Sequence, residues 1–365
     1  MIPIAKPIIG DAERKAVLNV LNSGMLVQGP KVKELEESFA RYCGAKHAVA
    51  VSNGTTALHT ALCAVGVKPG DDVITSPFTF VATANAILMA GARVVFADVD
   101  EETFTIDPVH VERKITDKTK ALLPVDLYGL PADYAELKAL IMHHNHAIKI
   151  IADACQAVGA QYDGELVGSI ADVSAFSLYA TKNIMCGEGG IVTTNNDAYA
   201  EHMRKFRHHG QNTQYSYEFL GYNYRMTDLH AAIAIEQLKN ADAWTKKRQH
   251  NARLMSELLA GVSGITLPVV PAHSTHVFHQ YTIRVRSGRD KLAAYLTEHG
   301  VGCKVFYPTP LHLEAHLRAG YNNGDFPVAE RLCSEVLSIP IHPLVTEDDV
   351  RFIAKAVKEG MKRNL

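Results

Sequence analysis

Seven short runs of apolar and β-branched residues follow one another along the first half of the chain, and most are separated by stretches of helical composition. The runs are AVAV (48–51), DVIT (72–75), RVVFAD (93–98), ALLPV (121–125), IKIIAD (148–153), VSAFS (173–177) and GIVTT (190–194). Short buried runs that alternate with helices are typical of a parallel sheet covered on both faces. The sequence therefore predicts an α/β fold with a mostly parallel seven-stranded sheet between helices.

The rest of the chain indicates helices before this sheet and a second unit after it. One early helix is expected to start at Asp11 as its N-cap, and another covers KVKELEESFARYCG. Later come a strand at QYTIRVR, a helix at RDKLAAYLTEHG, a strand at CKVFY and two helices, of which the last opens on the capping pair Thr346 and Asp349. We predict a large α/β domain over residues 1–249 and a smaller α+β domain over residues 250–365.

Composition narrows the class of protein. Of the 365 residues, 47% are hydrophobic and 21% charged, and the net charge of −2 offers no basic surface for nucleic acid. The six cysteines lack metal-binding spacing, and the most apolar long segment, VATANAILMAGARVVFA, is interrupted by Asn85, Gly91 and Arg93. We therefore expect a cytoplasmic protein with no metal, membrane or nucleic-acid partner.

Polar residues follow three of the predicted strands, at the sheet edge where ligands of α/β proteins bind. After AVAV, the segment SNGTTAL places Thr55 and Thr56 at the start of a helix, whose free N–H groups suit an anion. IKIIAD ends on Asp153, and VSAFS ends on Ser177, five residues before Lys182. Taken singly, each feature has an ordinary explanation: N-capping, a structural ion pair, or a lysine that reaches solvent.

Together, these groups match the needs of one cofactor. Pyridoxal 5′-phosphate (PLP) requires a phosphate site, a carboxylate for its ring nitrogen and a lysine that forms a Schiff base. A partly buried lysine loses its proton more readily and becomes an amine nucleophile. The glycines Gly187, Gly189 and Gly190 are expected to let the backbone turn and approach a ligand closely. The combination predicts a PLP site.

The chain also resembles a known family. The segments SNGTTAL, SPFTFVATANAI, IADACQA, FSLYATKNIMCGEGG, GYNYRMTDLHAAIA and FYPTPLH are similar, in this order, to motifs of the DegT-type nucleotide-sugar aminotransferases, a group of fold-type I PLP-dependent enzymes. This resemblance spans nearly the whole chain. It implies transfer of an amino group from glutamate to a 4-keto or 3-keto nucleotide-linked deoxysugar, through a pyridoxamine phosphate intermediate, in amino-sugar and polysaccharide biosynthesis.

The resemblance also implies roles for the cofactor residues. Lys182 is similar to the lysine of the internal aldimine, and Asp153 to the partner of the pyridinium nitrogen. Gln156 is expected near the ring and its 3-hydroxyl, and Phe80 is expected to stack on the ring face. The phosphate is expected on the hydroxyl groups of Thr55, Thr56 and Ser177.

Other positions correspond to the partner subunit and the sugar site. The family pattern implies a homodimer with shared active sites, in which Asn223 reaches the phosphate of the partner's site, with Arg225 a second candidate there for an anionic substrate group. Substrate contacts are expected from Tyr307, His312, Gln28 and Lys31. Asp126, in PVDLYG, replaces a frequent histidine and is expected to alter only substrate contacts.

Two alternatives stay open. One is a PLP lyase or desulfurase, for which Cys155 or Cys186 would supply the thiol. The other is a regulatory relative that keeps the fold and the cofactor but turns over no substrate. A dehydratase, in which histidine replaces the lysine, is disfavoured by Lys182.

Overall fold

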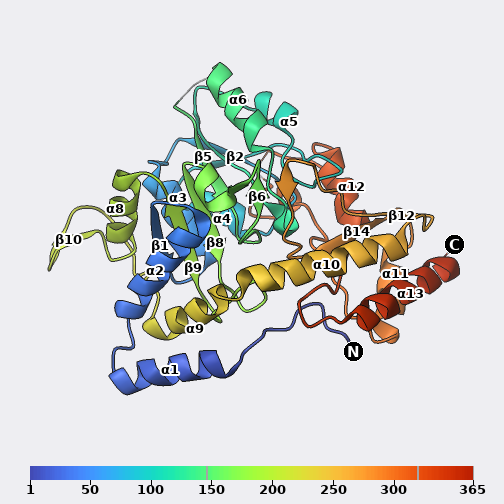
Figure 1. The fold of residues 1–365 in the computed structure, drawn as a ribbon. Helices are drawn as coiled ribbons and strands as arrows, with labels where there is room; N and C mark the ends of the chain where they lie inside the picture. The colour runs from blue at the N-terminus through green and yellow to red at the C-terminus, as the bar shows by residue number, and fades with distance from the viewer. Residues whose placement is uncertain (145–146, 319, 365) are drawn as a thin grey trace.

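The centre of the computed structural model, which describes residues 1–144, 147–318 and 320–364, is a seven-stranded sheet (Figure 1). In spatial order, its strands are β1 (His47–Val51), β9 (Gly190–Thr194), β8 (Val173–Ser177), β5 (Lys149–Asp153), β4 (Thr119–Leu123), β2 (Asp72–Thr75) and β3 (Arg93–Phe96). Only β9 is antiparallel to its neighbours. The prediction of a mostly parallel seven-stranded sheet is confirmed, and each strand lies in its predicted run or overlaps it.

The register of the sheet places the C-terminal ends of β1, β8 and β5 together at one edge of the sheet. Gly190 opens β9 and pairs with Val51 at the end of β1 and with Ser177 at the end of β8. On the next strand, Asp153 at the end of β5 pairs with Ala175. The polar residues that follow β1, β5 and β8 therefore meet at the same edge of the sheet.

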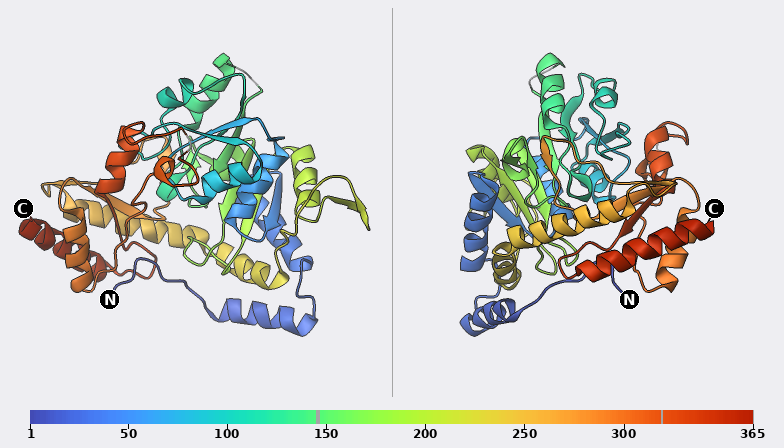
Figure 2. Two further views of the ribbon diagram at one scale, coloured as in Figure 1. Left: turned by 180° about the vertical axis from the view of Figure 1, so that it is seen from behind. Right: turned by 45° about the vertical axis from the view of Figure 1, so that its right-hand side comes forward.

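Helices cover both faces of the sheet (Figures 1 and 2). One buried cluster includes side chains of α2 (Pro30–Cys43), α6 (Tyr134–His144) and α9 (Asp228–Leu238). The cluster on the other face includes α3 (Gly54–Ala64), α4 (Ala82–Met89), α8 (Asp197–Phe206) and α12 (Pro327–Glu335). The first helix, α1 (Asp11–Ser23), packs along α9.

The expected N-cap of α1 is wrong by one residue. Asp11 is the first helical residue, and Gly10 occupies the cap position, where its N–H donates to Glu13 Oε2 at 2.8 Å. The capping pair of the last helix is confirmed: the Thr346 N–H donates to Asp349 Oδ2 at 2.9 Å, and the Asp349 N–H donates to Thr346 Oγ1 at 3.1 Å.

The C-terminal part has its own core. A three-stranded antiparallel sheet of β12 (Ile265–Thr266), β14 (Tyr281–Val285) and β15 (Val336–Ile339) packs with α10 (Ala241–Leu259), α11 (Arg289–Glu298) and α13 (Glu347–Asn364). The predicted boundary between residues 249 and 250 falls within α10. This continuous helix buries Ala241 in the first core and Met255 in the C-terminal core, so it joins the two cores rigidly.

The predicted strand at CKVFY is wrong. Only Lys304 pairs there, through an isolated bridge to Ser338, and the third strand of the sheet is the unpredicted β15. After Lys304 the chain turns toward the large sheet, where the Phe306 carbonyl accepts a hydrogen bond from the Tyr128 hydroxyl. Pro308 and Pro310 follow and lack the N–H groups that a strand would need.

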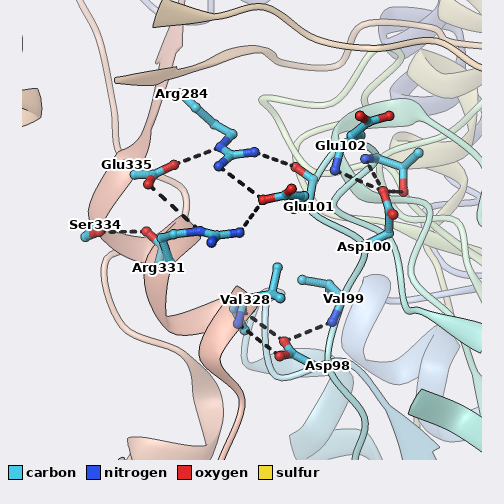
Figure 3. A network of polar contacts seen from close by, with 12 residues as sticks. Asp98, Val99, Asp100, Glu101, Glu102, Arg284, Val328, Arg331, Ser334 and Glu335 are labelled. Atoms are coloured by element: carbon cyan, nitrogen blue, oxygen red, sulfur yellow. Dashed lines mark hydrogen bonds and ion pairs between the residues drawn. The ribbon is translucent and has the colours of Figure 1, made fainter. Parts of the chain in front are cut away.

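A polar network ties α12 to the loop after β3 (Figure 3). The buried Asp98 carboxylate accepts the first free N–H groups of α12, from Val328 at 3.0 Å and Ala329 at 2.9 Å. Nearby, Arg284 of β14 contacts both Glu335, at 2.8 Å, and Glu101. The loop after β3, which contains Asp98 and Glu101, therefore connects the two parts of the molecule.

Short elements complete the fold. They are α5 (Pro108–Glu112), α7 (Val167–Ile170), η1 (Leu127–Gly129), η2 (Leu311–Leu313), a sheet of β13 (Ser274–Thr275), β6 (Gln161–Tyr162) and β7 (Glu165–Leu166), and a hairpin of β10 (Gln211–Thr213) and β11 (Ser216–Tyr217). Among the described residues, no helix combines the length and the apolar character that crossing a lipid bilayer requires.

Candidate active site

A cavity of about 550 Å³ lies where the ends of β1, β5 and β8 meet. Its lining combines residues of both parts of the molecule and of the N-terminal segment. From the predicted set it includes Thr55, Phe80, Asp153, Gln156, Ser177, Lys182 and Tyr307. Seven predicted residues, far apart in sequence, therefore share one cavity.

The start of α3 forms one side of the cavity. Gly54 lies so close to β8 that a Cβ atom there would be 2.8 Å from Ser177 Cβ, so only glycine fits without a shift. Asn53 caps the helix by accepting the Thr56 N–H at 2.9 Å. The Thr56 hydroxyl is buried within this cap, where it donates to the Asn53 carbonyl at 2.9 Å, and Thr56 does not line the cavity. Of the two predicted threonines, the structure offers Thr55 to a ligand.

Asp153 is a buried carboxylate without a cationic partner. Thr83 Oγ1 donates to its Oδ2 at 2.7 Å, and the Cys155 N–H donates to its Oδ1 at 3.3 Å. Within the described parts of the chain, no basic side chain forms an ion pair with it. A buried, unpaired carboxylate is costly unless a cation from elsewhere faces it. The cavity thus presents a carboxyl group suited to a cationic ring nitrogen.

Lys182 lies in the loop between β8 and β9, held by a hydrogen bond from its N–H to the Tyr179 carbonyl at 2.8 Å. Burial lowers the pKa of its side chain, although the nearby Cys155 and Asp153 raise it in part. A lowered pKa increases the fraction of neutral amine at physiological pH. The geometry therefore provides a nucleophilic amine beside an anionic carboxylate.

Of the three glycines after Lys182, Gly187 makes the predicted turn, with a φ of 91°, whereas Gly189 and Gly190 serve a different purpose from the one predicted. A Cβ atom at Gly190 would lie 2.1 Å from the Asn53 carbonyl oxygen, and one at Gly189 would lie 2.5 Å from Cys186 Sγ. Gly190 lets the start of β9 pack against the loop before α3, and Gly189 leaves room for the Cys186 side chain. Their space is filled by protein rather than by a ligand.

Aromatic and amide groups form the facing wall. The rings of Phe80 and Tyr307 have centroids 6.1 Å apart, and Phe80 is 55% exposed, so its face is free to contact a flat ligand. The Gln156 side chain bridges the two parts of the molecule, accepting the Tyr128 N–H at 2.8 Å and donating to the Tyr307 hydroxyl at 3.3 Å. Gln156 is therefore fixed in the wall.

Besides Thr56, five predicted residues do not line this cavity. Asn223 is exposed, and Arg225 contacts His208 Nδ1 at 2.8 Å. Lys31 pairs with Glu34 at 2.7 Å, and Gln28 Oε1 is buried without a hydrogen-bond partner among the residues that the structure describes. Within a single chain, these four residues therefore lie outside the cavity.

His312 is the fifth, and the prediction that it shapes the sugar site is not supported by its position. Its side chain is fully buried, 3.0 Å from Glu330, and packs on the Phe326 ring. Asp126 is likewise buried, and accepts the Ala132 N–H and the Tyr134 hydroxyl at 2.9 Å. Burial raises the pKa of Asp126 to about 8. Both side chains stabilise the fold rather than face the cavity.

Sequence reasoning missed three residues of the site. Thr83 supports Asp153, while Tyr128 and His279 line the cavity. Thr83 lies in SPFTFVATANAI, but its partner is 70 positions away, and His279 lies in a segment with no pattern of its own. Only the tertiary fold brings these residues to the cavity.

The residues present fit PLP. An open helix N-terminus with Thr55 and Ser177 suits a phosphate, and the unpaired Asp153 suits a protonated ring nitrogen. Phe80 and Tyr307 supply an apolar wall, and Lys182 supplies the amine.

The sequence profile of the DegT/DnrJ/EryC1/StrS aminotransferase family matches residues 7–358. The chain belongs to this family. The identification confirms the family that the motifs predicted and makes the chain a member of a family of aminotransferases.

Relatives and solved structures are similar over nearly their whole lengths. The pleiotropic regulatory protein of Geobacillus stearothermophilus is 42% identical over 344 residues, which cover 93% of this chain and 92% of the relative. The dTDP-3-amino-3,4,6-trideoxy-alpha-D-glucose transaminase of Streptomyces venezuelae is 38% identical over 350 residues, covering 95% and 92%. The crystal structure of S. venezuelae DesV in complex with a ketimine intermediate has a TM-score of 0.94 at 36% identity, covering 99% of each chain. The PLP form of Streptococcus pneumoniae Spr1654 has a TM-score of 0.94 at 28% identity, covering 100% and 99%.

Proposed function

We propose that this member of the DegT/DnrJ/EryC1/StrS family transfers an amino group from glutamate to a nucleotide-linked 3-keto or 4-keto sugar, with PLP as its cofactor. The observation that carries the proposal is the presence of Lys182 and the unpaired Asp153 carboxylate in one cavity. Whole-chain similarity to a nucleotide-sugar transaminase supports the substrate class.

Each group has a part in binding. Thr55, Ser177 and the N–H groups of the first turn of α3 would hold the phosphate, and Asp153 would face the ring nitrogen and keep it protonated. Thr83 holds Asp153 in place through its 2.7 Å hydrogen bond. Phe80 and Tyr307 would flank the ring.

PLP, when bound, supplies an aldehyde that condenses with amines and a ring that takes up electrons from the adjacent carbon. Lys182 Nζ would form and release the bond to the aldehyde carbon, because burial favours its neutral amine. The same amine, when free, would serve as the base and acid that moves a proton at the reacting carbon of the substrate. The enclosing wall of Gln156 and Tyr307 would limit water at this point.

A homodimer completes the proposal. Asn223 and Arg225 do not line the cavity of their own chain, and Asn223 is exposed. This placement supports their contribution to the cavity of the partner subunit. Large apolar side chains are exposed on the chain, including Val27 and Leu220, and such side chains suit a surface that a second copy covers.

The cysteine-based alternative is disfavoured. Burial raises the pKa of the Cys155 thiol well above its ordinary value, and also that of Cys186. A thiol that stays protonated is a poor nucleophile, so neither residue is suited to desulfuration. The regulatory alternative is favoured by one observation, the 42% identity to a protein named as a regulator.

A substrate screen tests the proposal. PLP-loaded protein is incubated with glutamate and a panel of UDP-, GDP- and dTDP-linked 3-keto and 4-keto sugars, with products identified by mass. We expect at least one amino sugar from the wild-type protein and none from Lys182→Ala. Bound PLP without amination of any sugar would favour the regulatory alternative.

A further inference from the structure

His279 is a buried histidine that lines the same cavity as Lys182. It precedes β14, and its Nδ1 lies 3.1 Å from Asn183 Oδ1, on the residue that follows Lys182. The Asn183 Nδ2 donates to the Val277 carbonyl at 3.4 Å, which leaves Oδ1 as the atom that faces His279. Since Oδ1 only accepts, His279 Nδ1 must carry the proton of the neutral ring.

The backbone around His279 is fixed from two sides. Arg248 of α10 is buried and donates to the carbonyls of Phe278, at 3.1 Å, and His279, at 3.4 Å. On the other side, the Gln280 N–H donates to the Tyr128 carbonyl at 3.2 Å. His279 is therefore a rigid support, whereas Asn183 lies in a loop.

The charges around His279 keep the ring neutral. Burial, together with the neighbouring Lys182, Arg248 and His276, lowers its pKa well below the ordinary value. The neutral form with a proton on Nδ1 leaves Nε2 as an acceptor, and no described residue donates to it. The ring thus offers one donor to Asn183 and one acceptor to the cavity.

We propose that His279 is a positioning residue for Lys182, acting through its hydrogen bond to Asn183. The inference rests on the proposed function in that Lys182 is taken to be the residue that bonds to PLP. Fixing the neighbour of Lys182 limits the directions in which Nζ can point. A reacting group displaced by about 1 Å loses on the order of 100-fold in rate, so this restraint matters to the chemistry.

Two substitutions separate positioning from general packing. His279→Asn retains a donor near the Nδ1 position, whereas His279→Leu removes it at similar bulk. We expect His279→Leu and Asn183→Ala each to lower kcat about tenfold, and the double variant to be no worse than either, because both break one interaction. His279→Asn should recover most of the activity. Additive losses, or equal losses in the Asn and Leu variants, would overturn the proposal.

A second readout does not depend on turnover. The visible circular dichroism per bound PLP reports how the cofactor is oriented by its bond to Lys182. We expect it to fall in His279→Leu and Asn183→Ala and to persist in His279→Asn. His59→Asn is the control, since His59 is also a buried histidine but does not line the cavity. An equal fall in this control would contradict the specific role of His279.

The two proposals fail in distinguishable ways. If no sugar is aminated but the dichroism follows the expected pattern, the substrate proposal fails and the positioning role stands. If sugars are aminated and the dichroism is the same in all variants, the positioning role fails. Thermal unfolding of each variant identifies those that do not fold, and the comparison then relies on the remaining ones.

Discussion

At the scale of single residues, Asp153 has the least ordinary position. Its carboxylate is buried at the end of β5 with a hydroxyl and an N–H as its hydrogen-bond partners, and it forms no direct ion pair among the residues described, although Lys182 lies nearby. Folding alone gives no reason to keep such a charge. A cationic ring nitrogen supplied by a cofactor does give one.

Replacing Asp153 should therefore lower the turnover rate more than it lowers the ability of Lys182 to bond to PLP. In Asp153→Ala, turnover should fall by at least about 100-fold, since electrostatic stabilisation by one buried group is worth roughly 3–4 kcal/mol. Lys182 should still bond to PLP. Thr83→Val, which removes only the supporting hydroxyl, should cost about tenfold. Steady-state rates and absorbance of the bound cofactor check both, and unchanged turnover in Asp153→Ala would contradict its role.

The sequence alone was enough to predict the site residues whose place follows from the strand pattern around them. Lys182, Asp153 and Ser177 follow strands, and strand ends meet at one edge of a parallel sheet. It was insufficient for Thr56 and His312, because a hydroxyl can cap its helix and a histidine can join the core without any change in the local pattern. His279 was missed because its partner is 96 positions away.

At the scale of elements, the loop after β3 and α12 depend on each other. Asp98 satisfies two of the free N–H groups at the start of α12, and its side chain is 1% exposed (Figure 3). The acidic segment that contains it is a structural joint. Its function could not be predicted from charge alone, because the helix that it caps lies 230 residues later.

Asp98→Ala should lower the free energy of unfolding by about 1–2 kcal/mol, the usual cost of losing an N-cap. Chemical denaturation measures the change. Glu102→Ala in the same loop is the control, since Glu102 is exposed and no dashed line joins its side chain to α12 in Figure 3. Equal stability of the Asp98 and Glu102 variants would contradict the capping role.

Elements with strong periodicity were predicted well, and those set by tertiary contacts were not. The seven sheet strands and α11 lie where the pattern placed them. The strand at CKVFY is replaced by a turn toward the cavity, because the Phe306 carbonyl and Tyr307 are engaged there. The extent of the two domains stays a prediction, and α10 crosses the expected boundary.

At the scale of the whole molecule, the proposed dimer makes a quantitative prediction. Lys182→Ala and Asn223→Ala each impair every site of their own homodimer. If Asn223 acts on the partner's site, a mixed dimer has one intact site. Random mixing of the two variants should therefore restore about a quarter of the wild-type sites. Rates measured before and after mixing check this, and no recovery would contradict shared sites.

The free energy of unfolding should also depend on pH, because some histidines are buried in their neutral form. His59 is buried among aromatic rings, and burial lowers its pKa to about 4. As the pH falls from 6.5 to 4, the unfolded chain takes up a proton at this residue before the folded protein does, so stability is lost in that window. Relative to His59→Asn, the wild type should lose about 3 kcal/mol. Unfolding at several pH values measures this, and a constant difference would contradict it.

The most direct test of the central claim is a half-reaction without any sugar. Glutamate added to the PLP-loaded protein should convert the cofactor to its pyridoxamine form and release an equal amount of 2-oxoglutarate, and Lys182→Ala should do neither. Absorbance follows the cofactor, and an enzyme-coupled assay measures the oxoacid. Cofactor that remains as PLP in the wild-type protein, with no oxoacid formed, would contradict glutamate-dependent transamination at Lys182.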